Sequence, residues 1–345
     1  MTEHEKEDLP AGLPLSEDAV LELIDRHFEK THPGLVLGRG DDCAILANQG
    51  NLCTSTDMFL ENVHFRRSYF YPFELGHKSL AVNISDLAGF GAKPLAFTLC
   101  LGLPHWVSMV WLDSFFRGMG SLANKYRIAL AGGDLSRSRD LYIAISIFGE
   151  AQDNCGFLTR SAAMPGDIIF VVGDLGLARI GLEELENAGR EAIPKWPVCC
   201  RSHLVPEPRV DAGLMLARAG YNSRPPALMD LSDGVARDLP RLLARSAKAG
   251  KRLPGANLYL SENMLHPELC VHAREKKQDP VLKAILGGED YALLGTCAPD
   301  LFKSLNSAIP ELWQLGEVSD KSGIRLNNED ISNLAGFDHF ERKGA

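Results

Sequence analysis

Aspartates beside small residues recur along the chain, and they are its first feature with chemical meaning. Each has a structural explanation when taken singly, because Asp and Ser cap helices and Asp beside Gly forms turns. Several of them, however, adjoin apolar runs that predict buried strands or helices, so their carboxylates are expected near the ends of buried elements. The segments are Gly40-Asp41-Asp42, Ser55-Thr56-Asp57, Ser85-Asp86, Gly133-Asp134 and Asp230-Leu231-Ser232-Asp233.

Carboxylates gathered at such places repel one another unless a cation lies between them. Magnesium prefers oxygen ligands, and it typically takes one or two carboxylates together with substrate phosphates. A pocket with several aspartates could hold several magnesium ions, which bridge nucleotide phosphates and neutralise developing charge. The aspartate pattern therefore indicates an enzyme that transfers phosphate from ATP with the help of magnesium.

The common alternatives for nucleotide chemistry are missing from the sequence. No G-x-x-x-x-G-K-[ST] loop occurs, since Gly76-His77-Lys78 lacks the leading glycine at the required spacing, and no strand-linked G-x-G-x-x-G follows either. The protein-kinase H-R-D and D-F-G motifs and the G-x-S-x-G nucleophile elbow are also absent. Phosphate transfer through the aspartates is therefore favoured over these mechanisms.

Alternating strand and helix patterns predict a mixed α/β protein that presents these aspartates from several separate loops and element edges. Residues 75–90 are predicted as a helix that carries Asp86, and strand 51–56 is followed by Asp57 and a loop. Strand 128–131 leads into a Gly-Gly-Asp turn, and strand 228–230 leads into Asp233. The 345 residues exceed one usual hydrophobic core, and the polar segment 149–156 predicts a boundary between domains 1–150 and 151–345.

The composition of the chain indicates which partners are disfavoured and in which cellular compartment it is expected. The chain carries 36 Lys and Arg against 45 Asp and Glu, a formal net charge of −9, which does not favour nucleic acid or an anionic membrane. No apolar run approaches the ~20 residues of a membrane helix, and the acidic start does not read as a signal peptide. The eight cysteines form no C-x-x-C pair, so we expect a soluble, cytoplasmic protein without a disulfide framework.

Taken in order, the motifs resemble those of the thiamine-monophosphate kinases, within the aminoimidazole-ribonucleotide-synthetase-like superfamily. The resemblance covers nearly the whole chain, and its most specific parts are the Asn-x-Ser-Asp-Leu-Ala segment, the STD…VHF loop and the GGEDY stretch. The matching segments are GDDCA (40–44), STDMFLENVHF (55–65), HKSLAVNISDLAGFGAKP (77–94), AGGD (131–134), LTRSAAMPGD (158–167), HLVPEPR (203–209), MDLSDGVARDL (229–239), GGEDYALL (287–294) and GFDHF (336–340).

The resemblance implies transfer of the ATP γ-phosphate to thiamine monophosphate, giving thiamine diphosphate. It implies a two-domain synthetase-like kinase fold: an N-terminal mixed sheet with dimerising strands, which makes a homodimer, and a C-terminal α/β domain that closes the active-site cleft. By position, the implied magnesium ligands are Asp41, Ser55, Thr56, Asp57, Asp86, Asp134, Asp230 and Asp233, of which Asp57, Asp134 and Asp233 are the implied catalytic residues. The implied ATP contacts are Gly133, Asp134, Arg160, Ser232 and Tyr126. The implied thiamine-phosphate contacts are His64, Glu289 and Phe337, the last by stacking on the cationic thiazolium ring.

The chain departs from the family pattern at Asn62, Leu135 and Ala162, where the family usually has Gly, Thr and Gly. These departures concern the geometry of the nucleotide loops and remove no implied ligand. Two other functions stay open. One is a sister ATP-dependent synthetase of the same superfamily with another substrate, and the other is a non-catalytic regulator that binds nucleotide or thiamine.

Overall fold

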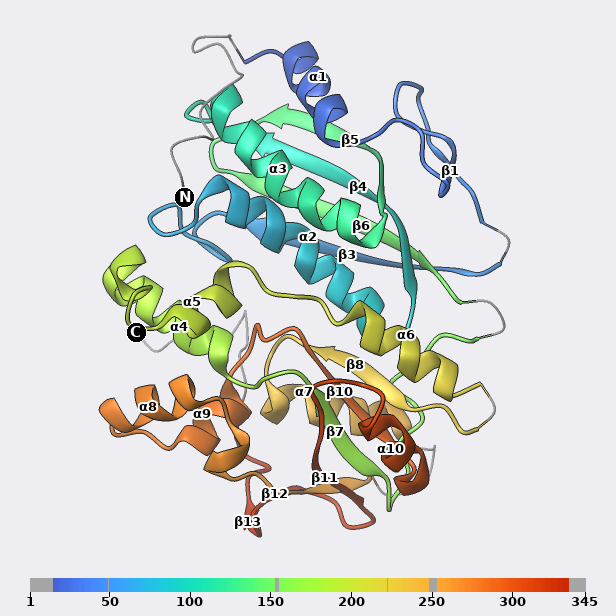
Figure 1. The fold of residues 1–345 in the computed structure, drawn as a ribbon, viewed down its shortest axis with the longest axis vertical. Helices are drawn as coiled ribbons and strands as arrows, with labels where there is room; N and C mark the ends of the chain where they lie inside the picture. The colour runs from blue at the N-terminus through green and yellow to red at the C-terminus, as the bar shows by residue number, and fades with distance from the viewer. Residues whose placement is uncertain (1–14, 49, 153–154, 222, 248–252, 335–345) are drawn as a thin grey trace. The chain divides into compact units, whose positions relative to one another are not determined.

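The computed structural model describes residues 15–48, 50–152, 155–221, 223–247 and 253–334 (Figure 1). By its contacts the chain forms two compact units. The first comprises the described residues of 1–49, 54–83 and 94–148, and the second those of 50–53, 84–93 and 149–345. Both units combine helices with sheets, which confirms the predicted mixed α/β class. Within the described ranges, no helix is both long enough and apolar enough to cross a membrane.

The first unit is built on a four-stranded sheet in the order β3-β6-β4-β5. Helices α2 and α3 lie across one face of this sheet (Figure 1). On β4, Phe97, Leu99 and Leu101 are buried, whereas Cys100 between them is exposed, as a strand with one covered face requires. The elements are α1 (Glu17–His27), β1 (Leu35–Leu37), β2 (Ile45–Leu46), β3 (Leu52–Leu60), α2 (Pro72–Gly89), β4 (Lys93–Leu103), α3 (Met109–Tyr126), β5 (Ala129–Arg137) and β6 (Tyr142–Glu150).

Helices α2 and α3 approach each other at two glycines. A Cβ atom at Gly76 of α2 would lie 1.9 Å from the carbonyl oxygen of Phe115, and one at Gly118 of α3 would lie 1.9 Å from that of Phe73. No side chain fits at either distance, so glycine is required at both positions for this helix packing.

The second unit is built on a seven-stranded sheet in the order β13-β12-β9-β11-β7-β10-β8. Neighbouring strands of this sheet pair antiparallel, except that β12 pairs parallel with β9. Strand β7 consists only of apolar residues and is buried along its whole length. The elements are β7 (Ile168–Val172), α4 (Leu177–Ala188), η2 (Gly189–Ala192), α5 (Pro197–Leu204), α6 (Val210–Ala219), β8 (Ala227–Leu231), α7 (Val235–Ser246), β9 (Gly255–Leu258), η3 (Glu262–Met264), α8 (Pro267–Glu275), α9 (Pro280–Leu286), β10 (Ala292–Cys297), α10 (Pro299–Asn306), β11 (Leu312–Ser319), β12 (Ile324–Leu326) and β13 (Glu329–Asp330).

Two local predictions about the aspartates are wrong. Strand β3 continues to Leu60, so Asp57 lies inside a strand and does not begin a loop. Strand β5 continues to Arg137, and Asp134 pairs with Cys100 in the parallel register instead of ending a turn. The absence of a side chain at Gly133 permits this pairing, because a Cβ there would lie 1.8 Å from a carbonyl oxygen of β4.

Candidate functional site

The loop with Asp41 and Asp42 joins β1 to β2 and is held in place by Arg39. The Arg39 guanidinium donates to the carbonyl oxygen of Leu130 at 2.7 Å and to the carboxylate of Asp25 at 3.0 Å. The Asp42 N–H donates to Asp41 Oδ1 at 2.8 Å, and both aspartates are exposed. The loop is therefore anchored to α1 and β5 while its carboxylates face solvent.

The polar residues of β3 point to both faces of the sheet. Strand alternation places Ser55 and Asp57 on the same side as the buried Phe59. Thr56 points the other way, and its Oγ1 lies 2.9 Å from Ser146 Oγ on β6. Asp134 is exposed and lies opposite Cys100, so it points to the same side as Thr56. Side-chain direction thus groups Ser55 with Asp57, and Thr56 with Asp134.

Asp86 and Asp230 come together in the second unit. Gly89 makes this possible, because a Cβ there would lie 2.4 Å from the backbone nitrogen of Asp230, so the end of α2 lies directly on β8. Burial, and then the carboxylates of Asp86 and Asp238, raise the pKa of Asp230 well above its ordinary value, and Arg160 opposes them. Buried carboxylates that repel one another fit a site for a cation with oxygen ligands.

The loop after β8 carries Ser232 and Asp233 and is held by two residues of α7. Asp238, which is fully buried, accepts from the backbone N–H groups of Ser232 at 3.2 Å and Asp233 at 2.9 Å. Arg241 donates to Asp233 at 2.6 Å and to Asp238 at 3.0 Å. Asp238 and Arg241 are not among the residues implied by the motifs, although their spacing of three places them on one helix face.

In the part of the chain that the structure describes, no three His, Cys, Asp or Glu side chains form a group that could hold a metal ion. The implied ligands instead form smaller sets in each unit. Among these ligands, Asp230 is the one whose pKa is raised by burial and by the neighbouring Asp86 carboxylate.

The other implied nucleotide contacts lie on surface positions. Arg160 is exposed beside Thr159, whose carbonyl oxygen accepts from the N–H of Leu228 at 3.1 Å, so Arg160 lies next to the start of β8. Gly133 is exposed on β5. Tyr126, the last residue of α3, is half-buried, and the Lys125 ammonium lies 5.1 Å from its ring centroid.

Two of the three implied substrate contacts, His64 and Glu289, lie within the residues that the structure describes. His64 Nδ1 accepts from the N–H of Leu60 at 3.0 Å, so a neutral His64 carries its hydrogen on Nε2, and its ring stacks on Phe59. Glu289 lies in the loop between α9 and β10, half-buried, with Oε2 3.0 Å from Nδ1 of His203. Phe337 lies outside the described residues.

Residues 40–151 match the family described as AIR synthase related protein, N-terminal domain. A thiamine-monophosphate kinase from Escherichia coli (strain K12) is 36% identical over 334 residues, which covers 92% of this chain and 97% of that protein. The chain therefore belongs to the thiamine-monophosphate kinase family, as the motif resemblance predicted.

Solved structures support the same relation. The crystal structure of thiamine-monophosphate kinase from Stenotrophomonas maltophilia K279a is 30% identical, with a TM-score of 0.78, and the match covers 92% of this chain and 98% of that one. AaThiL complexed with AMPPCP and TMP is 26% identical, with a TM-score of 0.73, and the match covers 96% and 100%. The synthetase-like kinase fold predicted from the sequence is thereby confirmed.

Proposed function

We propose that this chain transfers the γ-phosphate of ATP to thiamine monophosphate and so makes thiamine diphosphate. The observation that carries the proposal is its match to thiamine-monophosphate kinases along almost its whole length, 92% of it for the Escherichia coli relative. A similar chain, AaThiL, has been solved with AMPPCP and TMP, which supports ATP as the co-substrate.

We propose magnesium as the metal, with several ions bound. Asp86 and Asp230 fit such an ion best, because burial and the nearby Asp86 carboxylate raise the pKa of Asp230, and a cation between the two would offset both effects. When bound, magnesium would neutralise charge on the phosphates during transfer. The further proposed ligands, which are all oxygen donors, are Asp41, Ser55, Thr56, Asp57, Asp134 and Asp233.

We propose that transfer is direct and in line. The terminal phosphate oxygen of the acceptor is already a nucleophile, so the protein needs no strong general base, and it acts by positioning and electrostatics. Asp57, Asp134 and Asp233 are the proposed catalytic residues. Gly133, Arg160, Ser232 and Tyr126 are proposed to contact ATP, and His64, Glu289 and Phe337 to contact thiamine monophosphate, with a His64 Nε2–H as a phosphate donor.

A chromatographic assay tests this function. Purified protein is incubated with ATP, magnesium and thiamine monophosphate, and each is omitted in turn. Thiamine diphosphate and ADP are expected in equal amounts, and only when all three are present. ATP consumption without thiamine diphosphate would point to a sister enzyme with another substrate, and ligand binding without turnover would point to a regulator.

We also propose a homodimer that forms through the sheet of the first unit. On the side away from α2 and α3, Met58 and Tyr142 have exposed fractions of 57% and 40%, and Cys100 is exposed as well. An exposed patch of this kind on a sheet marks an interaction surface, and a two-fold dimer buries the same patch on both copies.

Met58→Lys is expected to shift the protein from dimer to monomer, because it places two charges in the proposed interface. The measurement is molar mass by sedimentation equilibrium. Met164→Lys is the matched control, since Met164 has a similar exposed fraction of 46% but lies in the second unit. A monomeric wild type, or a dimer that survives Met58→Lys, would contradict this interface.

We propose that the protein acts in the cytoplasm. All eight of its cysteines are free thiols, and Cys43 and Cys100 among them are exposed. Free exposed thiols are suited to a reducing compartment, where they are not driven into disulfides.

A further inference from the structure

The loop that carries Glu289 has a strained backbone. Glu289 has a φ of +64° and Tyr291 a φ of +48°, both in the left-handed region that residues with side chains rarely adopt. Two backbone hydrogen bonds hold this shape: the Glu289 N–H donates to the carbonyl oxygen of Ser232 at 2.7 Å, and the Tyr291 N–H donates to that of Leu231 at 3.0 Å. Strain of this kind persists only where the surrounding structure enforces it, and it is common at ligand sites.

Asp290, between the two strained residues, fixes the loop from the other side. Its carboxylate accepts from the backbone N–H groups of Gly176 at 2.6 Å and Ala178 at 3.2 Å, at the start of α4. Burial raises the pKa of Asp290 to about 7, against the lowering by these two hydrogen bonds. Glu289, the residue before Asp290, is itself half-buried.

His203 is the residue that meets the Glu289 carboxylate. Its side chain is fully buried on α5, and its Nδ1 lies 3.0 Å from Glu289 Oε2, a distance that a hydrogen bond spans. A carboxylate has no hydrogen to give at neutral pH, so Nδ1 carries the hydrogen of this pair.

Helix α5 gives His203 little freedom to move. Its first turn is capped by Glu268 of α8, which accepts from the N–H of Cys199 at 2.8 Å. Its backbone also lies directly on α4, because a Cβ at Gly181 would lie 2.1 Å from the carbonyl oxygen of Cys199. The imidazole is thus a rigid support for a glutamate that has three rotatable bonds of its own.

We propose that His203 is a positioning residue for substrate binding, which holds the Glu289 carboxylate in the orientation that meets thiamine monophosphate. This inference rests on the proposed function, and it adds a residue that the motif resemblance did not assign. His203 itself does not touch the substrate. It removes the rotamer freedom that Glu289 would otherwise lose on binding, and so strengthens the interaction of the Glu289 carboxylate with the cationic thiazolium ring of the substrate.

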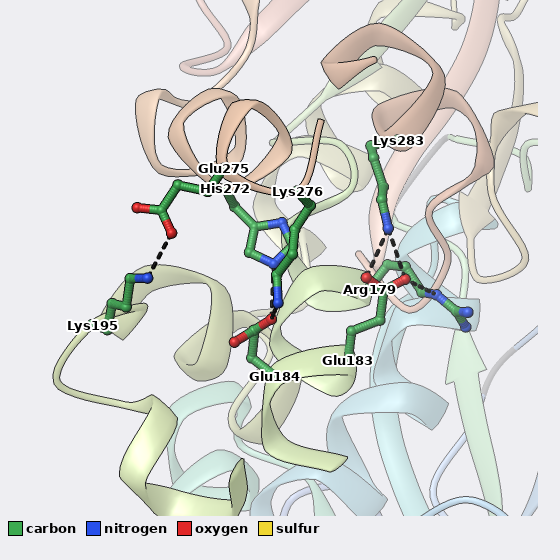
Figure 2. A network of polar contacts seen from close by, with 8 residues as sticks. All are labelled: Arg179, Glu183, Glu184, Lys195, His272, Glu275, Lys276 and Lys283. Carbon is green, nitrogen blue, oxygen red and sulfur yellow. Dashed lines mark hydrogen bonds and ion pairs between the residues drawn. The ribbon is translucent and has the colours of Figure 1, made fainter. Parts of the chain in front are cut away.

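The same unit offers a matched control pair. His272 of α8 is also almost fully buried, and its Nε2 lies 3.0 Å from the carboxylate of Glu184 near the end of α4. Figure 2 shows His272 and Lys276 converging on Glu184, apart from the pair of Lys283 with Glu183. His272 is therefore a buried histidine whose glutamate partner lies on a helix and not in the strained loop.

The test compares His203→Leu, His203→Asn and His272→Leu in steady-state kinetics, with thermal unfolding as the check of folding. His203→Leu is expected to raise KM for thiamine monophosphate about tenfold, because it removes the charge-assisted hydrogen bond to Glu289. KM for ATP is expected to stay unchanged. His203→Asn keeps a donor near the Nδ1 position and is expected to recover most of this loss. His272→Leu lowers the unfolding temperature but leaves both KM values as in the wild type.

A double-mutant cycle with Glu289→Gln then tests whether His203 acts through Glu289. If it does, His203→Leu adds little to the KM of the Glu289→Gln variant. An unchanged KM in His203→Leu, equal effects on both substrates, additive effects in the cycle, or no recovery in His203→Asn would each overturn the role of His203 while the kinase function stands. A wild type that neither binds nor converts thiamine monophosphate would overturn both.

Discussion

Asp57→Asn is expected to lower kcat for thiamine diphosphate formation by about 10²- to 10³-fold, and Asp134→Asn to do the same. Each change keeps the size of the side chain but removes a negative oxygen that is proposed to hold magnesium against the transferring phosphate. Losses of this order are typical when one preorganised electrostatic group is removed from an active site. The measurement is the initial rate at saturating ATP and thiamine monophosphate over a range of magnesium concentrations.

Folding should survive both substitutions, because Asp134 is exposed and Asp57 is partly exposed. Asp18→Asn serves as the charge-matched control, because Asp18 is exposed in the first turn of α1. The kcat of this variant is expected to stay within about twofold of that of the wild type. Near-normal turnover in both the Asp57 and Asp134 variants would remove the electrostatic mechanism proposed here.

Gly118→Ala is expected to destabilise the protein by about 3 kcal/mol or more. The new methyl group would lie 1.9 Å from the carbonyl oxygen of Phe73. Helices α2 and α3 would therefore have to move apart where they pack against each other. Urea unfolding followed by circular dichroism measures this loss as a change in the midpoint.

Gly120→Ala is the control for that substitution, two residues further along the same helix. A Cβ at Gly120 would lie 3.4 Å from the carbonyl oxygen of His27, which is ordinary contact, and alanine favours a helix over glycine by up to about 1 kcal/mol. Gly120→Ala is therefore expected to be neutral or stabilising. Equal stability of the two variants would show that the helices do not pack as closely as described.

Patterns that are local in the sequence predicted their elements well. The helix predicted over residues 75–90, which carries Asp86, is α2 (Pro72–Gly89), and the strand predicted over residues 228–230 is β8 (Ala227–Leu231). Sheet pairing is not local, and this is why the strands with Asp57 and Asp134 were predicted too short. Their polar and glycine residues favour turns, but the neighbouring strands supply hydrogen-bond partners that keep them extended.

The residues of the candidate site likewise divide into those that the sequence alone reveals and those that depend on the fold. Aspartates and the GGED stretch could be found because their residue types are informative in themselves. His203, Asp238 and Arg241 could not, because a buried histidine or a helix-surface ion pair looks ordinary in sequence and gains its meaning from the partner it meets. The orientation of β3 side chains likewise depends on which face the helices cover.

The contact between Asp290 and α4 occupies a helix start of a kind that often binds phosphate. Strand β7, a turn with Gly173 and Gly176, and then α4 give the strand-turn-helix layout that often receives a phosphate at the helix start. Here the Asp290 carboxylate accepts from the backbone N–H groups of Gly176 and Ala178, which a phosphate would otherwise meet. Asp290 therefore takes the place that an anion would occupy at this helix start, and the glycine-rich turn joins α4 to the Glu289 loop.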